Sequence, residues 1–365
     1  MHQTHEARRD ALRARLVEHE LDAMLVTDLR NIRYLTGFTG SNAALLVHSA
    51  EDKRSVFCTD GRYEQQAAAE VGQLEQVIER QCGSALTRRA AADRERFRRL
   101  GFESQHVSVD TYDALLEQAE GVELRRAPGL VERLRMVKDE SEIEAIRMAC
   151  AAADRALAEV IEQGEVRAGM TERQIARELE SRMMDNGAAG PAFETIVAAG
   201  AHSAIPHHRP TDAELCTGDL VKIDFGALVD GYHSDMTRML VVGPPADWQR
   251  ELYQLVRTAQ AAGCQAALGG AELAAVDRAA REVIERAGYG ERFLHGLGHG
   301  VGLDVHEAPR LAKEATGTLA AGMTVTVEPG VYLADRGGVR IEDTLAVRED
   351  GNEVLTLSTK ELVTV

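Results

Sequence analysis

The 365-residue chain has no apolar stretch that approaches the roughly 20 consecutive residues of a membrane-spanning helix. Its first twenty residues, MHQTHEARRDALRARLVEHE, are charged and lack the apolar run of a secretory signal. The five cysteines stand apart, without a CxxC pair, which argues against a zinc cluster or a disulfide framework and indicates reduced thiols. We therefore expect a cytoplasmic protein with no membrane partner.

The chain also has few basic residues relative to its acidic ones. The chain has 42 lysines and arginines against 59 aspartates and glutamates, a net charge of −17. This balance argues against nucleic acid or an anionic membrane as a partner, and bound divalent cations would offset part of it. Apolar residues make up 44% of the chain, enough for a sizeable core, and the length favours two domains of unequal size.

The first part of the chain alternates helix and strand patterns. An amphipathic helix is expected over 6–19, and apolar strands follow at 23–27 and 43–47. The segment RAPG breaks this pattern with a Pro-Gly pair. We place the domain boundary there, which gives a first domain of residues 1–126 and a second of residues 127–365.

A helix start follows the expected boundary. Ser141 and Glu144 match the S-x-x-E capping box, in which each side chain bonds the other residue's backbone N–H. Apolar residues then recur at helical spacing, which predicts a helix from 141 to about 163.

The second domain repeats its own pattern. Residues 169–187 and 270–288 each have glycine at both ends and one amphipathic helix between them, and each is preceded by a longer helical segment, 141–163 and 247–268. Each segment is followed, about 40 residues later, by two strands joined by a glycine turn. The strand pairs are LVKIDFGALV with YHSDMTRMLVV, and TVTVEPGVYL with VRIEDTLAV. The pattern indicates two pseudo-symmetric halves.

Four carboxylates fall at matching places in the two hairpins. Asp224 and Asp235 lie on opposite arms of the first hairpin, and Glu328 and Glu342 on opposite arms of the second. Antiparallel pairing would bring each pair within one or two rungs. Like charges at that distance cannot all stay ionised without compensation. Two divalent metal ions are the simplest compensation.

The segment HGLGHGVGLDVHE (295–307) holds three histidines and four glycines. Gly296 stands where the zincin helix motif needs glutamate, and the glycines oppose a helix. We therefore expect an extended chain from which His299 supplies a nitrogen ligand to one metal. His306 could reach the substrate side of the site, and His295 could contact the substrate or support a ligand.

Taken together, the DFG…SDMTR pair, the histidine segment, VEPG and RIED resemble the pita-bread metallopeptidases, and more narrowly the branch of Xaa-Pro aminopeptidases and prolidases. The segment NIRYLTGFTGSNAALLV is similar to the creatinase-like amino-terminal domain of that branch. The resemblance covers essentially the whole chain. It implies an α/β (α+β) fold, with a creatinase-like α/β domain followed by a pseudo-two-fold pita-bread catalytic domain, and a homodimer.

The resemblance also implies a role for each potential metal ligand. Asp224 would chelate one metal ion, and His299 with Glu328 would bind the other. Asp235 and Glu342 would bridge the two ions. Manganese or cobalt suits such a carboxylate-rich set best, and zinc is also compatible with it.

The residues implied to bind substrate lie outside the ligand set. His207, in SAIPHHRP, falls at the family's substrate-binding histidine, although His208 beside it competes for that role. His306 would be the second such histidine, and Arg340 in GVRIED matches the active-site arginine. One departure from the family pattern is His202, which stands where an asparagine is expected before Ser-Ala.

A prolyl amide sets the chemistry, because it has no N–H and its ring fixes φ. A dedicated site must polarise the scissile carbonyl and protonate a tertiary nitrogen as it leaves. Glu328 is the best candidate to carry a proton to that nitrogen. We expect His207 and His306 to act in both binding and catalysis, as donors to the carbonyl or oxyanion. The resemblance implies that Arg340 also acts in both.

Three functions remain open at this point. The first, which we prefer, is an Xaa-Pro aminopeptidase that releases the residue before proline from peptides with proline at the second position. The alternative is a prolidase restricted to dipeptides, in which Arg310 could hold the prolyl carboxylate, although an arginine there could equally be a surface residue. The third is a non-catalytic binding module, which the intact ligand set disfavours.

Overall fold

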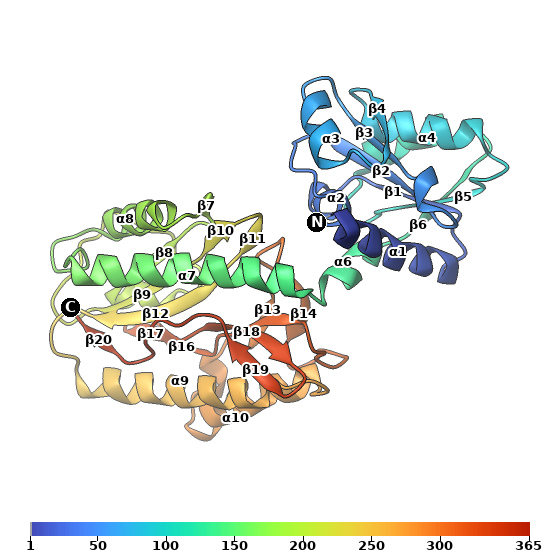
Figure 1. Cartoon of the computed structure of the whole chain (residues 1–365). Helices are drawn as coiled ribbons and strands as arrows, with labels where there is room; N and C mark the ends of the chain where they lie inside the picture. Colours follow the sequence, from blue (N-terminus) through green and yellow to red (C-terminus); the bar gives the residue numbers. More distant parts are fainter. Residues whose placement is uncertain (1) are drawn as a thin grey trace. The chain divides into compact units, whose positions relative to one another are not determined.

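The computed structural model describes residues 2–365 of the chain, and the side chains of residues 4–365. The chain forms two compact units, Met1–Arg135 and Met136–Val365 (Figure 1). The sequence analysis placed the boundary earlier, after residue 126. Helix α6 (Leu130–Arg135) lies between the two positions and packs against α1 (His2–Glu18) and α2 (Leu29–Thr36), so it belongs to the first unit.

A six-stranded sheet forms the centre of the amino-terminal unit, in the order β4-β3-β2-β1-β5-β6. Strands β1, β2 and β3 are buried along their whole length, as expected for strands covered on both faces. The strands are β1 (Ala23–Val26), β2 (Ala43–His48), β3 (Val56–Thr59), β4 (Glu75–Ile78), β5 (Arg99–Phe102) and β6 (Glu123–Arg126). The other helices are α3 (Glu64–Glu70), α4 (Cys82–Ala92) and α5 (Val109–Gln118).

Two pairs of helices flank the strands of the carboxy-terminal unit, α7 with α8 and α9 with α10 (Figure 1). The four helices match the four expected from the repeated pattern. Their bounds are α7 (Glu140–Glu162), α8 (Glu172–Asp185), α9 (Asp247–Ala266) and α10 (Leu273–Arg286). None of the helices described in residues 2–365 is long and apolar enough to cross a membrane.

The cap of α7 differs from the expectation. Asp139 is the N-cap residue, and its side chain accepts the backbone N–H of Glu142, whose carboxylate accepts the Asp139 N–H in return. The capping box therefore lies two residues before the expected pair, Ser141 and Glu144. Both pairs have the required spacing, and the earlier one prevails because Asp139 has the extended backbone that a cap requires.

The strands of the carboxy-terminal unit form four sheets. Their orders are β20-β12-β9-β8, β14-β13-β15-β18-β19, β11-β10-β7 and β16-β17. In the first half the strands are β7 (Gly190–Pro191), β8 (Ile196–Ala199), β9 (Leu220–Phe225), β10 (Ala227–Val229), β11 (Tyr232–His233) and β12 (Met236–Val241). In the second half they are β13 (Gly298–Gly300), β14 (Glu307–Leu311), β15 (Thr324–Val327), β16 (Gly330–Leu333), β17 (Gly337–Arg340), β18 (Asp343–Arg348) and β19 (Gly351–Val354), and β20 (Val363–Thr364) follows.

Each expected hairpin is present, but both of its arms are broken. In the first hairpin the inner strands β9 and β12 pair in one sheet, and the outer strands β10 and β11 in another. In the second hairpin β15 and β18 correspond to the inner strands, and β16 and β17 to the outer ones. Gly226 permits the first break, because a Cβ there would lie 1.9 Å from the carbonyl oxygen of Ser234.

Each half of the carboxy-terminal unit has its own apolar core. One core lies between α7, α8 and the sheet of β8, β9 and β12. The other lies between α9, α10 and the sheet of β13, β15 and β18. The repeated sequence pattern therefore corresponds to a repeated arrangement of two helices and a broken hairpin.

A buried ion pair joins the two halves. Arg238 on β12 donates from Nη2 to Oδ1 of Asp343 on β18 at 2.7 Å, and both side chains are nearly inaccessible. Arg238 also donates to the backbone carbonyl of Glu342. Gln260 and Lys360 bond the other oxygen of Asp343, so the buried carboxylate is fully compensated.

We predict that Arg238→Met lowers the free energy of unfolding of the carboxy-terminal unit by about 3–5 kcal/mol, because it leaves Asp343 buried with weaker compensation. Urea denaturation followed by the fluorescence of Trp248 measures this, since the single tryptophan lies on α9 of that unit. Arg257→Met, which breaks an exposed pair with Glu361, is the matched control and should cost less than about 1 kcal/mol. Equal losses in the two variants would contradict the prediction.

Candidate active site

A cavity of about 900 Å³ opens in the carboxy-terminal unit. All nine site residues expected from the sequence line it. They are Asp224, Asp235, His299, Glu328, Glu342, His207, His295, His306 and Arg340. The cavity therefore gathers residues that lie up to 135 positions apart in the chain, from His207 to Glu342.

The strand register explains why the four acids meet. Asp224 lies opposite Thr237, two residues beyond Asp235, so the two aspartates are diagonal neighbours on one face of the sheet. In the second hairpin the last paired residues are Val327 and Asp343. Glu328 and Glu342 are each the next residue toward the turn, so they also come together, at the end of the paired strands.

The carboxylates and the imidazole are close enough to share cations. Three groups of ligand atoms each lie within 4.8 Å of one another. The groups are Asp224 with Asp235 and Glu342, His299 with Glu328 and Glu342, and Asp235 with His299 and His306. Asp235, Glu342 and His299 each belong to two groups. Of these, only the two carboxylates have two oxygens with which to bridge two ions, because Nδ1 of His299 contacts the carbonyl of Gly300.

Repulsion among the acids shifts their ionisation. Burial, and then the charges of Glu342 and Asp224, raise the pKa of Asp235 well above its ordinary range. Burial, and then Glu328 and Asp224, raise the pKa of Glu342 in the same way. Burial also acts to raise the pKa of Glu328, but the hydrogen bond and charge of His299 outweigh it and lower this pKa to about 2. The cluster therefore needs positive charge to hold all its carboxylates ionised.

The donor set fits divalent metal ions. Oδ1 of Asp224 is buried and has no hydrogen-bond partner among the described residues, whereas its Oδ2 accepts from Arg340. A buried carboxylate oxygen without a partner is costly unless a cation meets it. Four carboxylates with one imidazole are also ligands that manganese, cobalt or zinc can use.

The histidine segment is extended, as expected, where it carries His299. His299 lies on β13, and its Nε2 is 3.4 Å from Oε1 of Glu328 and 3.6 Å from Oδ2 of Asp235. The ring of His306 meets that of His299 edge to face, with centroids 4.4 Å apart. His295 contacts the hydroxyl of Tyr332 at 2.8 Å, so it is held at the cavity wall by a residue that the sequence analysis did not single out.

The two adjacent histidines of SAIPHHRP point to different places. His207 is exposed and lines the cavity. His208 is buried, and its Nε2 lies 2.8 Å from Oε2 of Glu172. His207 is therefore accessible to a substrate in the cavity, whereas His208 is buried against Glu172.

Arg340 is buried beneath the acids, and 2% of its side chain is accessible. Its guanidinium donates to Asp224, to the Tyr332 hydroxyl and to the Thr237 hydroxyl. Thr237 in turn donates to Oε2 of Glu342 at 2.6 Å. Arg340 therefore holds one acid directly and a second through Thr237. Thr237 belongs to the motif SDMTR, in which only Asp235 was expected to have a role at the site.

Arg310 also lines the cavity. It lies on β14 directly opposite His299 on β13. Side chains of directly opposed residues stand on the same face of a sheet, with Cβ atoms about 5 Å apart. The exposed side chain of Arg310 thus starts beside the expected metal ligand.

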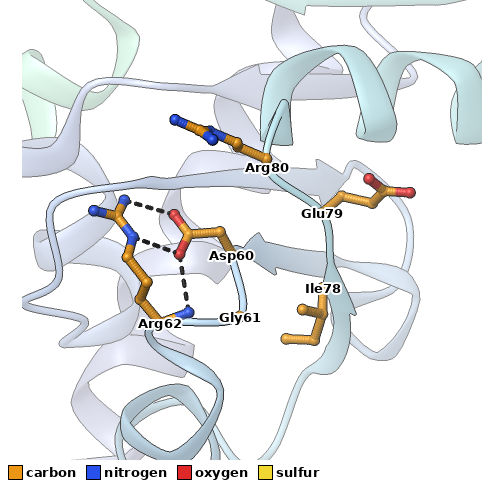
Figure 2. Close-up of a pocket in the computed structure, with 6 residues that line it drawn as sticks. All are labelled: Asp60, Gly61, Arg62, Ile78, Glu79 and Arg80. Atoms are coloured by element: carbon orange, nitrogen blue, oxygen red, sulfur yellow. Dashed lines mark hydrogen bonds and ion pairs between the residues drawn. The ribbon is translucent and has the colours of Figure 1, made fainter.

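A shallower cavity of about 470 Å³ lies in the amino-terminal unit and is lined by Asp60, Arg62 and Arg80, among others (Figure 2). Of its two carboxylates, Glu79 is exposed and Asp60 is already neutralised, because Asp60 accepts from the backbone N–H and the guanidinium of Arg62 (Figure 2). Hydrogen bonds from Arg62 and Asn42 lower the pKa of Asp60. The uncompensated acids lie instead in the larger cavity.

Comparison with known proteins covers both units. The family model of the creatinase/prolidase N-terminal domain matches residues 8–137, and that of metallopeptidase family M24 matches residues 144–349. The Xaa-Pro dipeptidase of Pyrococcus furiosus is 43% identical over 72% of this chain and 75% of its own length.

Two solved structures resemble the whole chain. The Xaa-Pro dipeptidase from Bacillus anthracis has a TM-score of 0.93 at 37% identity, over 99% of this chain and 100% of that one. The X-Pro aminopeptidase from Thermotoga maritima MSB8 has a TM-score of 0.88 at 34% identity, over 98% and 99% of the two chains. The chain therefore belongs to metallopeptidase family M24, with the pita-bread fold in its carboxy-terminal unit and a creatinase/prolidase domain in its amino-terminal unit.

Proposed function

We propose that the protein is a proline-specific exopeptidase that uses two divalent metal ions. The observation that carries the proposal is the set of four crowded carboxylates and one imidazole on a single cavity, with Asp235 and Glu342 each shared between two groups. The three relatives named above support the substrate class, because two are Xaa-Pro dipeptidases and one is an X-Pro aminopeptidase.

Within this class we propose a dipeptidase, a prolidase. The sequence analysis preferred an aminopeptidase, and the relatives favour its alternative, because the dipeptidases include the more similar of the two structures. Arg310 adds a physical reason. The carboxylate of an Xaa-Pro dipeptide lies one residue, about 3.5 Å, beyond the scissile bond. A cation opposite His299 is therefore within reach of a dipeptide's carboxylate.

Asp224 would hold one ion, His299 and Glu328 the other, and Asp235 and Glu342 both. Manganese is the metal that we propose, with cobalt or zinc as alternatives. When bound, the ions would lower the pKa of a water molecule and polarise the scissile carbonyl.

The remaining steps belong to the side chains of this chain. Glu328 would accept a proton from the attacking water and deliver it to the tertiary nitrogen of proline. His207 and His306 would donate hydrogen bonds to the carbonyl as negative charge develops on its oxygen. Arg340 would keep Asp224 oriented, and His295, fixed by Tyr332, would line the substrate pocket.

We predict that the chelator-treated protein binds about two Mn²⁺ per chain, and that each ion adds about 2.7 kcal/mol of stability, about 5.5 kcal/mol for both, when the free ion is 100 times its Kd. Elemental analysis gives the stoichiometry, and thermal unfolding gives the stabilisation. Asp235→Asn should remove most of the manganese-dependent shift, whereas Asp350→Asn, at an exposed position, should keep it. The same shift in both variants would rule out the proposed ligand set.

Glu328→Gln tests the proton transfer. We expect kcat on Ala-Pro to fall by a factor of about 10²–10⁴, because general acid–base catalysis typically contributes that much, with the fold retained. Circular dichroism and steady-state kinetics check the two statements. Glu314→Gln makes the same change at an exposed residue and should retain activity. More than a few per cent of residual activity in Glu328→Gln would refute the role.

Arg310→Met tests the length preference. Losing a charged hydrogen bond of about 1.5–3 kcal/mol should lower kcat/KM for Ala-Pro by about 10-fold to 150-fold. Ala-Pro-Ala, which has no carboxylate at that place, should change less than about twofold, and so should both substrates in the control Lys313→Met. If wild-type enzyme cleaves the tripeptide better than the dipeptide, the aminopeptidase is the correct alternative.

A further inference from the structure

His207 lies on a segment that hydrogen bonds from two buried side chains hold in place. This segment, residues 200–211, will be called the His207 loop; it leaves β8 through a short 3-10 helix, Gly200–Ala204. His207 itself is exposed at the cavity, yet its neighbours Ser203 and His208 are buried. An exposed side chain on an otherwise anchored loop has a defined position only if the anchors hold.

The first anchor is the carboxylate of Glu172, at the start of α8. The residue is fully buried, with 0% of its surface exposed, and its two oxygens accept hydrogen bonds from both ends of the loop. Oε1 accepts from the backbone N–H of Ala199 and contacts Nδ1 of His202, each at 2.9 Å. Oε2 accepts from the backbone and the hydroxyl of Thr211 and contacts Nε2 of His208 at 2.8 Å.

These contacts explain His202, the residue that departs from the family pattern. Its ring stacks on that of His208, with centroids 4.4 Å apart and planes at 28°. Glu172, His202 and His208 are also close enough together to be considered as cation ligands. Both oxygens of Glu172 are already occupied by N–H and O–H donors, however, so the cluster is better understood as a hydrogen-bonded anchor.

The second anchor bonds the middle of the loop. Lys222, a fully buried residue of β9, donates from Nζ to the backbone carbonyls of Ile205 and Pro206. Nη1 of Arg340 donates to the same Pro206 carbonyl at 3.1 Å. Two buried side chains therefore donate hydrogen bonds to the peptide group that precedes His207.

We propose that Glu172 and Lys222 are positioning residues that hold the His207 loop, and through it the imidazole of His207, at the substrate cavity. The inference deepens the proposed function, because it rests on His207 acting on substrate. The buried carboxylate of Glu172 accepts from N–H groups at the two ends of the loop, and Nζ of Lys222 donates to carbonyls in its middle, so the loop cannot shift without leaving a buried polar group unpaired. A misplacement of His207 by about 1 Å would be enough to slow turnover.

A double-mutant cycle tests the inference. We expect Glu172→Gln to lower kcat/KM on Ala-Pro by about 10-fold to 100-fold, because its amide nitrogen cannot accept the bonds of the carboxylate. In the His207→Ala background the same change should cost less than about twofold, since no imidazole remains to be positioned. An equal factor in both backgrounds would show that Glu172 acts through something else and overturn the inference.

Glu180→Gln, the same substitution further along α8, is the matched control and should leave kcat/KM unchanged. If Glu172→Gln does not fold, Thr211→Val takes its place in the cycle. It removes the hydroxyl that donates to Glu172 and accepts from the Ala213 N–H, and it keeps the side-chain shape. A smaller loss of about 3-fold to 10-fold is then expected. That loss should again vanish without His207, and its persistence would overturn the inference.

Hydrogen–deuterium exchange separates this inference from the proposed function. Glu172→Gln should speed amide exchange in peptides covering 200–211, and Glu180→Gln should not. Unchanged exchange in the first variant overturns the inference even if the enzyme is a dipeptidase. A wild-type protein inactive on every proline peptide would refute the proposed function, and faster exchange would still support the anchoring of the loop.

Discussion

Electrostatic repulsion among four carboxylates, three of them buried and Glu328 partly buried, is the constraint on which the carboxy-terminal unit depends. Each acid is placed by a strand end, and each strand end is fixed by buried cations or hydroxyls directly behind it. Arg340 bonds Asp224, Thr237 bonds Glu342, and Arg238 holds the backbone of Glu342. Negative charge is thus concentrated at the cavity, and the buried side chains of Arg238 and Arg340 behind it partly compensate that charge.

The duplication of the fold gives this charge its symmetry. The acids occupy equivalent breaks of two hairpins, yet the groups behind them are not equivalent. Arg238 comes from the first half and Asp343 from the second. The repeated pattern does not by itself call for a matching pair with the two halves exchanged. The halves have therefore diverged into complementary partners, so the motifs SDMTR and RIED describe one interaction between the halves as well as two sets of ligands.

Much of this arrangement could be predicted from the sequence because its signals are local. Helical periodicity gave the four helices of the repeat, and glycine turns gave the hairpins with their opposed acids. The cavity brings together all nine expected site residues. Their roles as ligands or catalytic groups still rest on the proposed function.

Contacts between distant segments could not be predicted in this way. Nothing around Glu172 indicates that its carboxylate anchors a loop some 30 residues away, because a glutamate in the first turn of a helix has an ordinary local explanation. The competing caps of α7 were equally ambiguous, since Asp139 and Ser141 both precede a glutamate at the right spacing. The place of α6 depended on packing against α1 and α2 rather than on the Pro-Gly break.

The order in which the sheets are completed has a consequence for synthesis of the chain. Strand β20 returns to the first half and pairs in parallel with β12, Leu240 opposite Val363. The sheet of the first half is therefore incomplete until β20 has been synthesised, although its other strands, β8, β9 and β12, are synthesised more than 100 residues earlier. The amino-terminal unit has no such delay, because its six strands lie within the first 126 residues and can fold while the rest is still on the ribosome.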